Sequence, residues 1–344
     1  MKKIEITTTF KKLMADVFTP VGIYLRLRDR FRDTILMEST DFHANDNSFS
    51  FIGINAIAGI EITNMHEVEY KFPGQKVEKI NIAQTEKVPG LLWNFMQRFY
   101  VNSVPEKPVK VVQGLFGYTS FDAVQFFDTI KFSASNPEPP MIPLMRYRLY
   151  QYVIAINHFK DELYICENQL YGLESEVAIV ESLIKSKDVP VFPFKTKEDE
   201  SSNMTDAEYT EMVEQGIKHC HRGDVFQIVL SRRFQQRFTG DDFNVYRTLR
   251  NINPSPYLFY FDYGDYKLMG SSPESQLIIQ GSKAVVHPIA GTFMRTGDDV
   301  TDKQLAEKLL ADAKENAEHV MLVDLARNDL SRKCDQVFVS SFRK

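Results

Sequence analysis

Two glutamates, Glu315 and Glu318, have the residue type and spacing of a candidate divalent-cation site. Apolar residues recur around them every three or four positions, which predicts one helix from Thr301 to about Leu325. Because each residue turns a helix by about 100°, two residues three positions apart share a face. Carboxylates in this arrangement can hold Mg²⁺ directly or through water. Glutamate pairs are also common on solvated helix faces, and the spacing alone favours that plainer interpretation.

Three further segments carry groups that could act on a bound molecule. Glu274 follows a Gly-Ser-Ser-Pro turn between two predicted strands, where a carboxylate would lie at a sheet end. Gln227 lies between valines on one face of a predicted strand, Val225–Arg233, and needs a hydrogen-bonding partner if it is buried. Gly291 and Thr292 follow another strand and offer close backbone approach together with a hydroxyl group. Each signal is weak by itself, since ordinary loops and strands contain the same residues.

The composition of the 344-residue chain is that of a globular protein, with 43% hydrophobic and 25% charged residues. Its formal net charge of -5 leaves no basic excess to neutralise phosphates, which argues against a nucleic-acid-binding protein. The three cysteines fit neither a disulfide framework nor a zinc site, so we expect a reducing, cytoplasmic location. The sequence has no run approaching the roughly 20 apolar residues that a membrane-spanning helix needs.

The chain is expected to divide into two parts joined by a polar connection. Residues 1–190 are rich in predicted strands, and Tyr152–Ile156 and Glu162–Cys166 flank a polar turn in the manner of a hairpin. Residues 191–205 are rich in charged residues and serine, which predicts a linker. Residues 206–344 begin with a helix that a capping-box sequence opens, and strands and a second helix follow.

Taken in order, five blocks of the second part resemble anthranilate synthase component I, a family of chorismate-utilising enzymes. The blocks are Gly223–Ser231, Asn253–Tyr257, Ser272–Glu274, Pro288–Thr292 and Glu315–Leu330. A sixth block in the first part, Gly114–Asp122, resembles the Gly-Tyr-Asp block of that family. The resemblance covers nearly the whole chain and rests on the order and spacing of the blocks together, which are not expected by chance.

The resemblance implies an α+β fold in which two large antiparallel β-sheets pack as a sandwich with outer helices. It implies conversion of chorismate and ammonia to anthranilate and pyruvate in tryptophan biosynthesis, with glutamine supplying the ammonia through a separate amidotransferase subunit. Glu315 and Glu318 would belong to a Mg²⁺ site, where the metal neutralises the ring carboxylate. Glu274 would be the general acid that protonates the departing hydroxyl group, a role that partial burial favours.

Two positions distinguish this chain from related chorismate enzymes. Ala290 stands where aminodeoxychorismate synthase component I, the alternative enzyme, usually carries a lysine that attacks the substrate, and alanine cannot form that bond. Gln227 stands where isochorismate and salicylate synthases carry a lysine that activates water, and glutamine cannot deprotonate water. Both residues favour attack by ammonia. Ala290, Gly291 and Thr292 would contact the substrate, which makes Thr292 and Gln227 candidate catalytic residues beside Glu274.

Leu36–Ser39 resembles one wall of the tryptophan feedback pocket of the family, and residues 253–259 resemble the other wall. Glu38 and Ser39 could hold the ammonium group of tryptophan, and apolar side chains could hold its indole ring. On the second wall the candidate contacts are Asn253, Pro254, Ser255, Tyr257, Leu258 and Phe259. A purely structural pocket is the alternative, because the sister enzyme has a similar element.

The resemblance ends near Gln336, and the remaining residues, 337–344, are few and basic. Relatives continue with a histidine-containing block, two glycine-containing blocks and a further glutamate pair, which complete the site and the sheets. We therefore expect that the chain is incomplete at its C-terminus and inactive by itself. The alternative is a non-catalytic protein that retains effector or partner binding. An ammonia-dependent assay of anthranilate fluorescence distinguishes the two.

Overall fold

The structure is a computed structural model that describes residues 3–39, 48–82, 87–102, 106–132 and 142–342. Its strands are β1 (Ile4–Met14), β2 (Thr34–Glu38), β3 (Phe49–Ile62), β4 (Glu67–Lys71), β5 (Glu78–Asn81), β6 (Phe99–Val101), β7 (Phe116–Thr119), β8 (Met145–Asn157), β9 (Glu162–Gln169), β10 (Phe194–Ser202), β11 (Phe234–Gly240), β12 (Tyr257–Asp262), β13 (Lys267–Ser272), β14 (Ile278–Gln280) and β15 (Lys283–Val285). Its helices are α1 (Pro20–Leu27), α2 (Val88–Met96), α3 (Lys107–Val112), α4 (Val177–Lys185), α5 (Asp206–Arg222), α6 (Phe243–Ile252), α7 (Asp299–Ala311) and α8 (Ala313–Ser331), with a short 3-10 helix at Phe121–Phe126.

The described residues form one large sheet of 11 strands and two separate hairpins, β10–β11 and β14–β15. The order along the large sheet is β13-β12-β2-β3-β8-β9-β1-β6, and β4, β5 and β7 attach to its sides. Only the β1–β6 pair of this sheet is parallel, within the described ranges. The α+β class with a large antiparallel sheet and outer helices is confirmed. Of the two large sheets predicted from the sequence, the described part of the chain forms this one.

The centre of the sheet is made by two long apolar strands. The 14-residue β3 runs antiparallel to the 13-residue β8. Their side chains Ile52, Ile54 and Ile154 are completely buried, as expected of β-branched residues on a covered sheet face. Strand β8 turns back into β9 with Ile154 opposite Ile165, which confirms the hairpin predicted over residues 152–166.

An aromatic cluster connects the beginning of the chain with its second half. Tyr24 from α1, Phe243 and Tyr246 from α6, and Tyr260 from β12 are buried together. The ring centroid of Phe243 lies 4.9 Å from the centroids of both Tyr24 and Tyr260, which is within the range of favourable aromatic pairs. This packing holds α6 against the sheet beside β12.

Strand β12 crosses the boundary predicted between the two parts, because it pairs with β2 from the first part. Residues Phe194–Ser202, inside the segment 191–205 predicted as a linker, form strand β10 and pair with β11. Backbone hydrogen bonding to the partner strand β11 outweighs the polar composition of this segment, which would favour a loop. Part of the predicted linker is therefore regular structure, and the linker at 191–205 and the domain limits stay a prediction.

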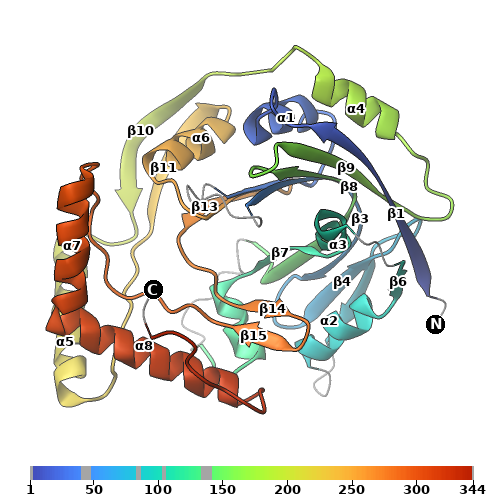
Figure 1. The fold of residues 1–344 in the computed structure, drawn as a ribbon. Coiled ribbons are helices and arrows are strands. Elements are labelled where there is room, and N and C mark those ends of the chain that lie inside the picture. The colour runs from blue at the N-terminus through green and yellow to red at the C-terminus, as the bar shows by residue number, and fades with distance from the viewer. Residues whose placement is uncertain (1–2, 40–47, 83–86, 103–105, 133–141, 343–344) are drawn as a thin grey trace.

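The helix predicted from Thr301 to Leu325 is instead two helices, α7 and α8, which meet at Asp312. Asp312 has extended backbone angles, φ -68° and ψ 122°, and its side chain accepts a hydrogen bond from the Glu315 backbone N at 3.0 Å. That capping bond begins a new helix and interrupts the apolar stripe. All residues of both helices are described, and none of them is buried. Both helices lie outside the large sheet (Figure 1).

The predicted start of the helix that opens the second part can be compared with the structure. Helix α5 begins as predicted, because Thr205 Oγ1 accepts from the Glu208 backbone N at 3.3 Å and Glu208 Oε2 accepts from the Thr205 backbone N at 2.7 Å. It ends at Gly223, which has a φ of 79°. On the exposed face of α8, Arg327 Nε donates to Asp324 Oδ1 at 3.1 Å. Among the described residues, every helix is too short or too polar to span a bilayer.

Candidate active site

Gly291 lies directly against the carboxylate of Glu315. A Cβ atom added at Gly291 would lie 1.7 Å from Glu315 Oε2 and 2.5 Å from Glu315 Cδ. Any side chain at this position would therefore displace the carboxylate. Gly291 belongs to the irregular segment after β15, and Glu315 belongs to the first turn of α8. The fold thus brings together two predicted site residues from separate segments.

Glu315 and Glu318 occupy the first turns of α8, and both are partly buried. The Glu315 side chain is 22% exposed, and Lys314 Nζ lies 4.0 Å from its Oε1. Mg²⁺ usually takes one or two protein carboxylates and completes its octahedron with water and substrate oxygens. Within the described ranges, three or more His, Cys, Asp or Glu side chains are nowhere grouped to hold a metal. The donor set fits a Mg²⁺ ion shared with water and a substrate carboxylate, and does not fit a metal held by protein alone.

The other predicted contacts of this site differ in exposure. Ala290 is partly buried beside Gly291, whereas Thr292 is exposed. Glu274 lies in the connection between β13 and β14, where its backbone N donates to Ser272 Oγ at 3.2 Å. The Glu274 side chain is exposed, so the partial burial expected of a general acid is not present, because the connection lies open to solvent.

Residues 225–233 do not form the strand predicted from their alternation. Ile228 and Leu230 approach helix α5, where a Cβ atom added at Gly216 would lie 3.4 Å and 3.5 Å from their side chains. Gln227 is exposed. The segment has the apolar alternation of a strand, but it has no pairing strand in the described part of the chain, and ladder bonds need a partner. The strand prediction is wrong, and the role of Gln227 stays a prediction.

The two predicted walls of the effector site are neighbouring strands. Strand β2 pairs with β12, and Glu38 lies opposite Leu258. The Glu38 side chain is 1% exposed, and its Oε2 accepts from Tyr246 Oη at 2.6 Å and lies 3.1 Å from Arg250 Nε. Burial raises the pKa of Glu38, while Tyr246 and Arg250 oppose that rise. Ser39, the next residue, is partly exposed.

The second wall is only partly arranged as a binding surface. Ser271 Oγ lies 2.5 Å from Asn253 O and 2.8 Å from Ser255 Oγ, so these polar groups hold the turn before β12. Leu258 and Ser255 are buried, Phe259 is partly buried and opposite Met37, and Asn253, Pro254 and Tyr257 are exposed. Leu258 and Phe259 of the predicted wall therefore lie opposite β2, whereas Asn253, Pro254 and Tyr257 lie at the surface.

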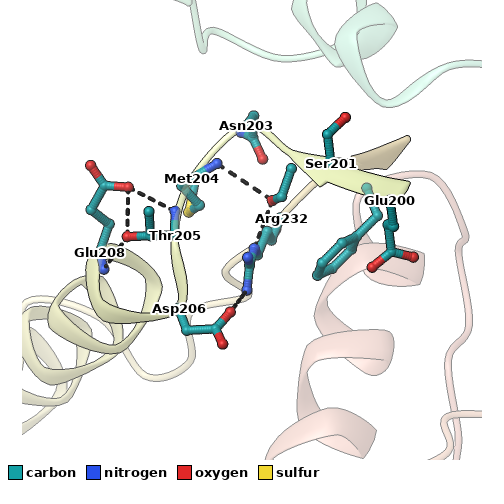
Figure 2. Close-up of a pocket in the computed structure, with 10 residues that line it drawn as sticks. Glu200, Ser201, Asn203, Met204, Thr205, Asp206, Glu208 and Arg232 are labelled. Carbon is teal, nitrogen blue, oxygen red and sulfur yellow. Dashed lines mark hydrogen bonds and ion pairs between the residues drawn. The ribbon is translucent and has the colours of Figure 1, made fainter. Parts of the chain in front are cut away.

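A cavity of about 500 Å³ lies between hairpin β10–β11 and the start of α5 (Figure 2). Arg232 contributes to its lining, with Nε donating to Ser202 Oγ at 2.7 Å and Nη1 donating to Asp206 Oδ1 at 2.5 Å. These contacts already engage the guanidinium group. The lining contains none of the site residues predicted from the sequence.

Sequence reasoning missed three contacts of the candidate sites. Asp312, followed three residues later by Glu315, has the spacing of a helix-capping sequence, so its role could have been recognised. Tyr246 and Arg250 are four residues apart and share one face of α6, but that spacing does not tell what the face contacts.

Comparison with known proteins identifies the family. A family model described as chorismate binding enzyme matches residues 58–344. Anthranilate synthase component 1 of Aquifex aeolicus is 32% identical over an alignment of 364 positions, which covers 99% of this chain and 70% of that protein. The protein of the same name from Thermus thermophilus is 32% identical over 333 residues, with 94% of this chain and 68% of that protein covered.

Solved structures agree with these relatives. Anthranilate synthase component I from Streptococcus pneumoniae has a TM-score of 0.62 at 26% identity, covering 94% of this chain and 69% of that one. The menaquinone-specific isochorismate synthase MenF from Escherichia coli has a TM-score of 0.60 at 15% identity, covering 96% of this chain and 65% of that one, which is a likeness of fold. The chain belongs to the family of chorismate-binding enzymes that includes anthranilate synthase component 1.

Proposed function

We propose that the chain carries the chorismate site of an enzyme that makes anthranilate. Ammonia would add to the ring of chorismate, the ring hydroxyl would leave as water, and elimination of pyruvate would give the aromatic amine. The observation that carries this proposal is the contact between Gly291 and Glu315, because it links the substrate segment to the acid pair. The names of the relatives support the same reaction.

Glu315 and Glu318 would hold Mg²⁺ together with water and a carboxylate of chorismate. A metal bound there would neutralise that carboxylate while charge develops on the substrate. The two partly buried carboxylates, with Lys314 Nζ as a cation 4.0 Å away, leave a net negative charge at the start of α8, which supports cation binding. The lack of a side chain at Gly291 leaves room for the Glu315 carboxylate.

The other predicted site residues would donate a proton, orient the substrate and determine which nucleophile attacks. Glu274 would donate a proton to the departing hydroxyl group once bound chorismate covers it. Ala290 offers no amine to attack the ring, and Gln227 offers no base to activate water. Ammonia is therefore the nucleophile that these residues favour, and Thr292 would orient the substrate through its hydroxyl group.

A second subunit would deliver the ammonia. The relatives are described as component 1, which supports a second component that acts with them. We propose a glutamine amidotransferase as this partner, and ammonium salts replace it in the experiments below.

Chorismate binding tests the proposed site. We expect calorimetry to detect chorismate binding that depends on Mg²⁺, and Glu315→Ala or Glu318→Ala to weaken it about 10- to 100-fold. Glu307→Ala, an exposed glutamate on α7, is the matched control and should bind as wild type does. With ammonium present, any product formed should be anthranilate. Aminodeoxychorismate or isochorismate as the product, or chorismate binding that neither Glu315→Ala nor Glu318→Ala weakens, would contradict the proposal.

We further propose that tryptophan binds as a feedback inhibitor where Glu38 of β2 lies opposite Leu258 of β12, with Glu38 close to its ammonium group. The pairing of Glu38 with Leu258 supports this site, since a carboxylate and apolar side chains then share one place. Glu38→Gln is expected to weaken tryptophan binding at least about tenfold by calorimetry. Asp265→Asn, in the exposed turn after β12, is the control. Equal tryptophan affinity in both variants would rule out this role for Glu38.

A further inference from the structure

A single aspartate, Asp312, lies between the end of α7 and the start of α8. The Asp312 backbone N donates to Leu309 O at 3.3 Å, which closes α7. The Asp312 side chain accepts from the Glu315 backbone N at 3.0 Å, and its backbone O accepts from the Asn316 N at 3.0 Å, which together open α8. Its extended angles, φ -68° and ψ 122°, change the direction of the chain at a single residue.

The interruption of the helix between α7 and α8 depends on the carboxylate of Asp312. Most residues on both sides of it, such as Leu309, Ala311 and Ala313, are strong helix formers. The apolar pattern of the sequence predicts one uninterrupted helix here. Alanine at this position would have the highest helix propensity and no oxygen to accept the capping bond, so it would favour the uninterrupted helix.

The break also determines where the acid pair points. Because Asp312 is the N-cap, Glu315 is the third residue of α8, and the capping bond ends on its own backbone N. The carboxylate of the same residue reaches Gly291. In one uninterrupted helix, Glu315 would follow the axis of α7, and its carboxylate would leave this position beside Gly291.

We infer that Asp312 is a positioning residue for the acid pair, which fixes the start of α8 so that the Glu315 carboxylate lies beside Gly291 and binds a divalent cation together with Glu318. This inference rests on the proposed function in one respect, namely that the acid pair is the metal site.

Binding of Mn²⁺ to the full chain in the presence of chorismate and the absence of ammonium, followed by the paramagnetic resonance signal of the free ion, tests this role without turnover. Asp312→Ala is expected to weaken Mn²⁺ binding about tenfold, because loss of an N-cap shifts a helix-start equilibrium by roughly 2- to 30-fold. Asp312→Ser keeps a capping oxygen and loses the charge, and it should bind Mn²⁺ within about threefold of wild type.

A matched control is available at the other end of α7. Asp298 caps α7 through the same kind of bond, from the Thr301 backbone N at 2.8 Å, so Asp298→Ala removes a helix cap without touching the α7–α8 junction. Its Mn²⁺ affinity should stay within about threefold of wild type. Glu315→Ala should abolish the binding.

The possible results distinguish the positioning role of Asp312 from the metal site formed by Glu315 and Glu318. Wild-type affinity in Asp312→Ala, with binding lost in Glu315→Ala, would overturn the role of Asp312 and leave the metal site intact. Equal weakening in Asp312→Ser and Asp312→Ala would also overturn it, because the charge and not the cap would then matter. Unchanged Mn²⁺ binding in Glu315→Ala would overturn the metal site and this inference with it.

Discussion

Gly291→Ala is expected to weaken Mg²⁺-dependent chorismate binding about 10- to 100-fold and to leave the fold almost unchanged. The new Cβ atom would overlap Glu315 Oε2 at 1.7 Å. Because that oxygen is the far end of a flexible side chain, the carboxylate would rotate away and the backbone would stay in place. The free energy of unfolding should change by less than about 1 kcal/mol, since alanine restricts the unfolded chain more than glycine does.

A double-mutant cycle distinguishes displacement of Glu315 from a general disturbance of the site. If Gly291→Ala acts only through Glu315, its effect on chorismate affinity should fall below about threefold in the Glu315→Ala background. Calorimetry in the presence of Mg²⁺ measures the affinities, and urea unfolding measures stability. Fully additive effects would contradict the contact between the two residues, and a large loss of stability would contradict the side-chain rotation.

Asp241→Ala is expected to lower the free energy of unfolding by about 3 to 5 kcal/mol. Asp241 accepts hydrogen bonds from Arg28 Nη1 at 2.8 Å and Nη2 at 2.6 Å, and the two side chains are 8% and 9% exposed. It also accepts from the Phe243 backbone N at 3.1 Å, at the start of α6. The substitution would leave the Arg28 guanidinium buried without its main partner, between α1 and the aromatic cluster.

The same pair predicts a loss of stability in acid. Burial by itself would raise the pKa of Asp241, but the hydrogen bonds from Arg28 and from the Phe243 N outweigh it and hold that pKa below the ordinary value of 3.8. A carboxyl group with a lower pKa in the folded chain adds stability above its ordinary pKa, and this contribution disappears as the pH falls through the folded value. The advantage of wild type over Asp241→Asn should therefore be complete above about pH 5 and should shrink below about pH 3.8.

The exposed pair of Arg222 and Asp224 provides the control for both experiments. Arg222 Nη2 lies 2.7 Å from Asp224 Oδ2, but the two side chains are 63% and 47% exposed. Asp224→Ala should therefore cost less than about 1 kcal/mol in urea unfolding. A cost for Asp241→Ala as small as this one would contradict the account of the buried pair.

The features of the fold that could be predicted are those with local signals. The hairpin over residues 152–166 follows from the alternation of its strands, and the start of α5 follows from capping chemistry at Thr205 and Glu208. The pairing of Glu38 with Leu258 joins segments far apart in the sequence, and local pattern contains no information about such a register. The resemblance to the family indicated the segments that contain Glu38 and Leu258, but only the fold shows that these segments are neighbours.

The candidate site was predictable as a set of residues and not as an arrangement. Block order indicated Gly291 and Glu315, yet their contact depends on the break at Asp312, where one capping aspartate overrides an uninterrupted apolar pattern. Gln227 illustrates the opposite error. Its segment has the local pattern of a strand, but a strand also requires a partner, which the described part of the chain does not provide.

Hydrogen exchange with and without chorismate and Mg²⁺ tests most directly whether residues 288–292 and the start of α8 form one substrate site. Residues 288–292 lie outside regular structure, so their amides should exchange rapidly in the free protein. We expect 288–292 and 313–318 to become protected together, and only when chorismate and Mg²⁺ are both present. Protection of neither segment, or protection confined to the cavity beside Arg232, would contradict the account.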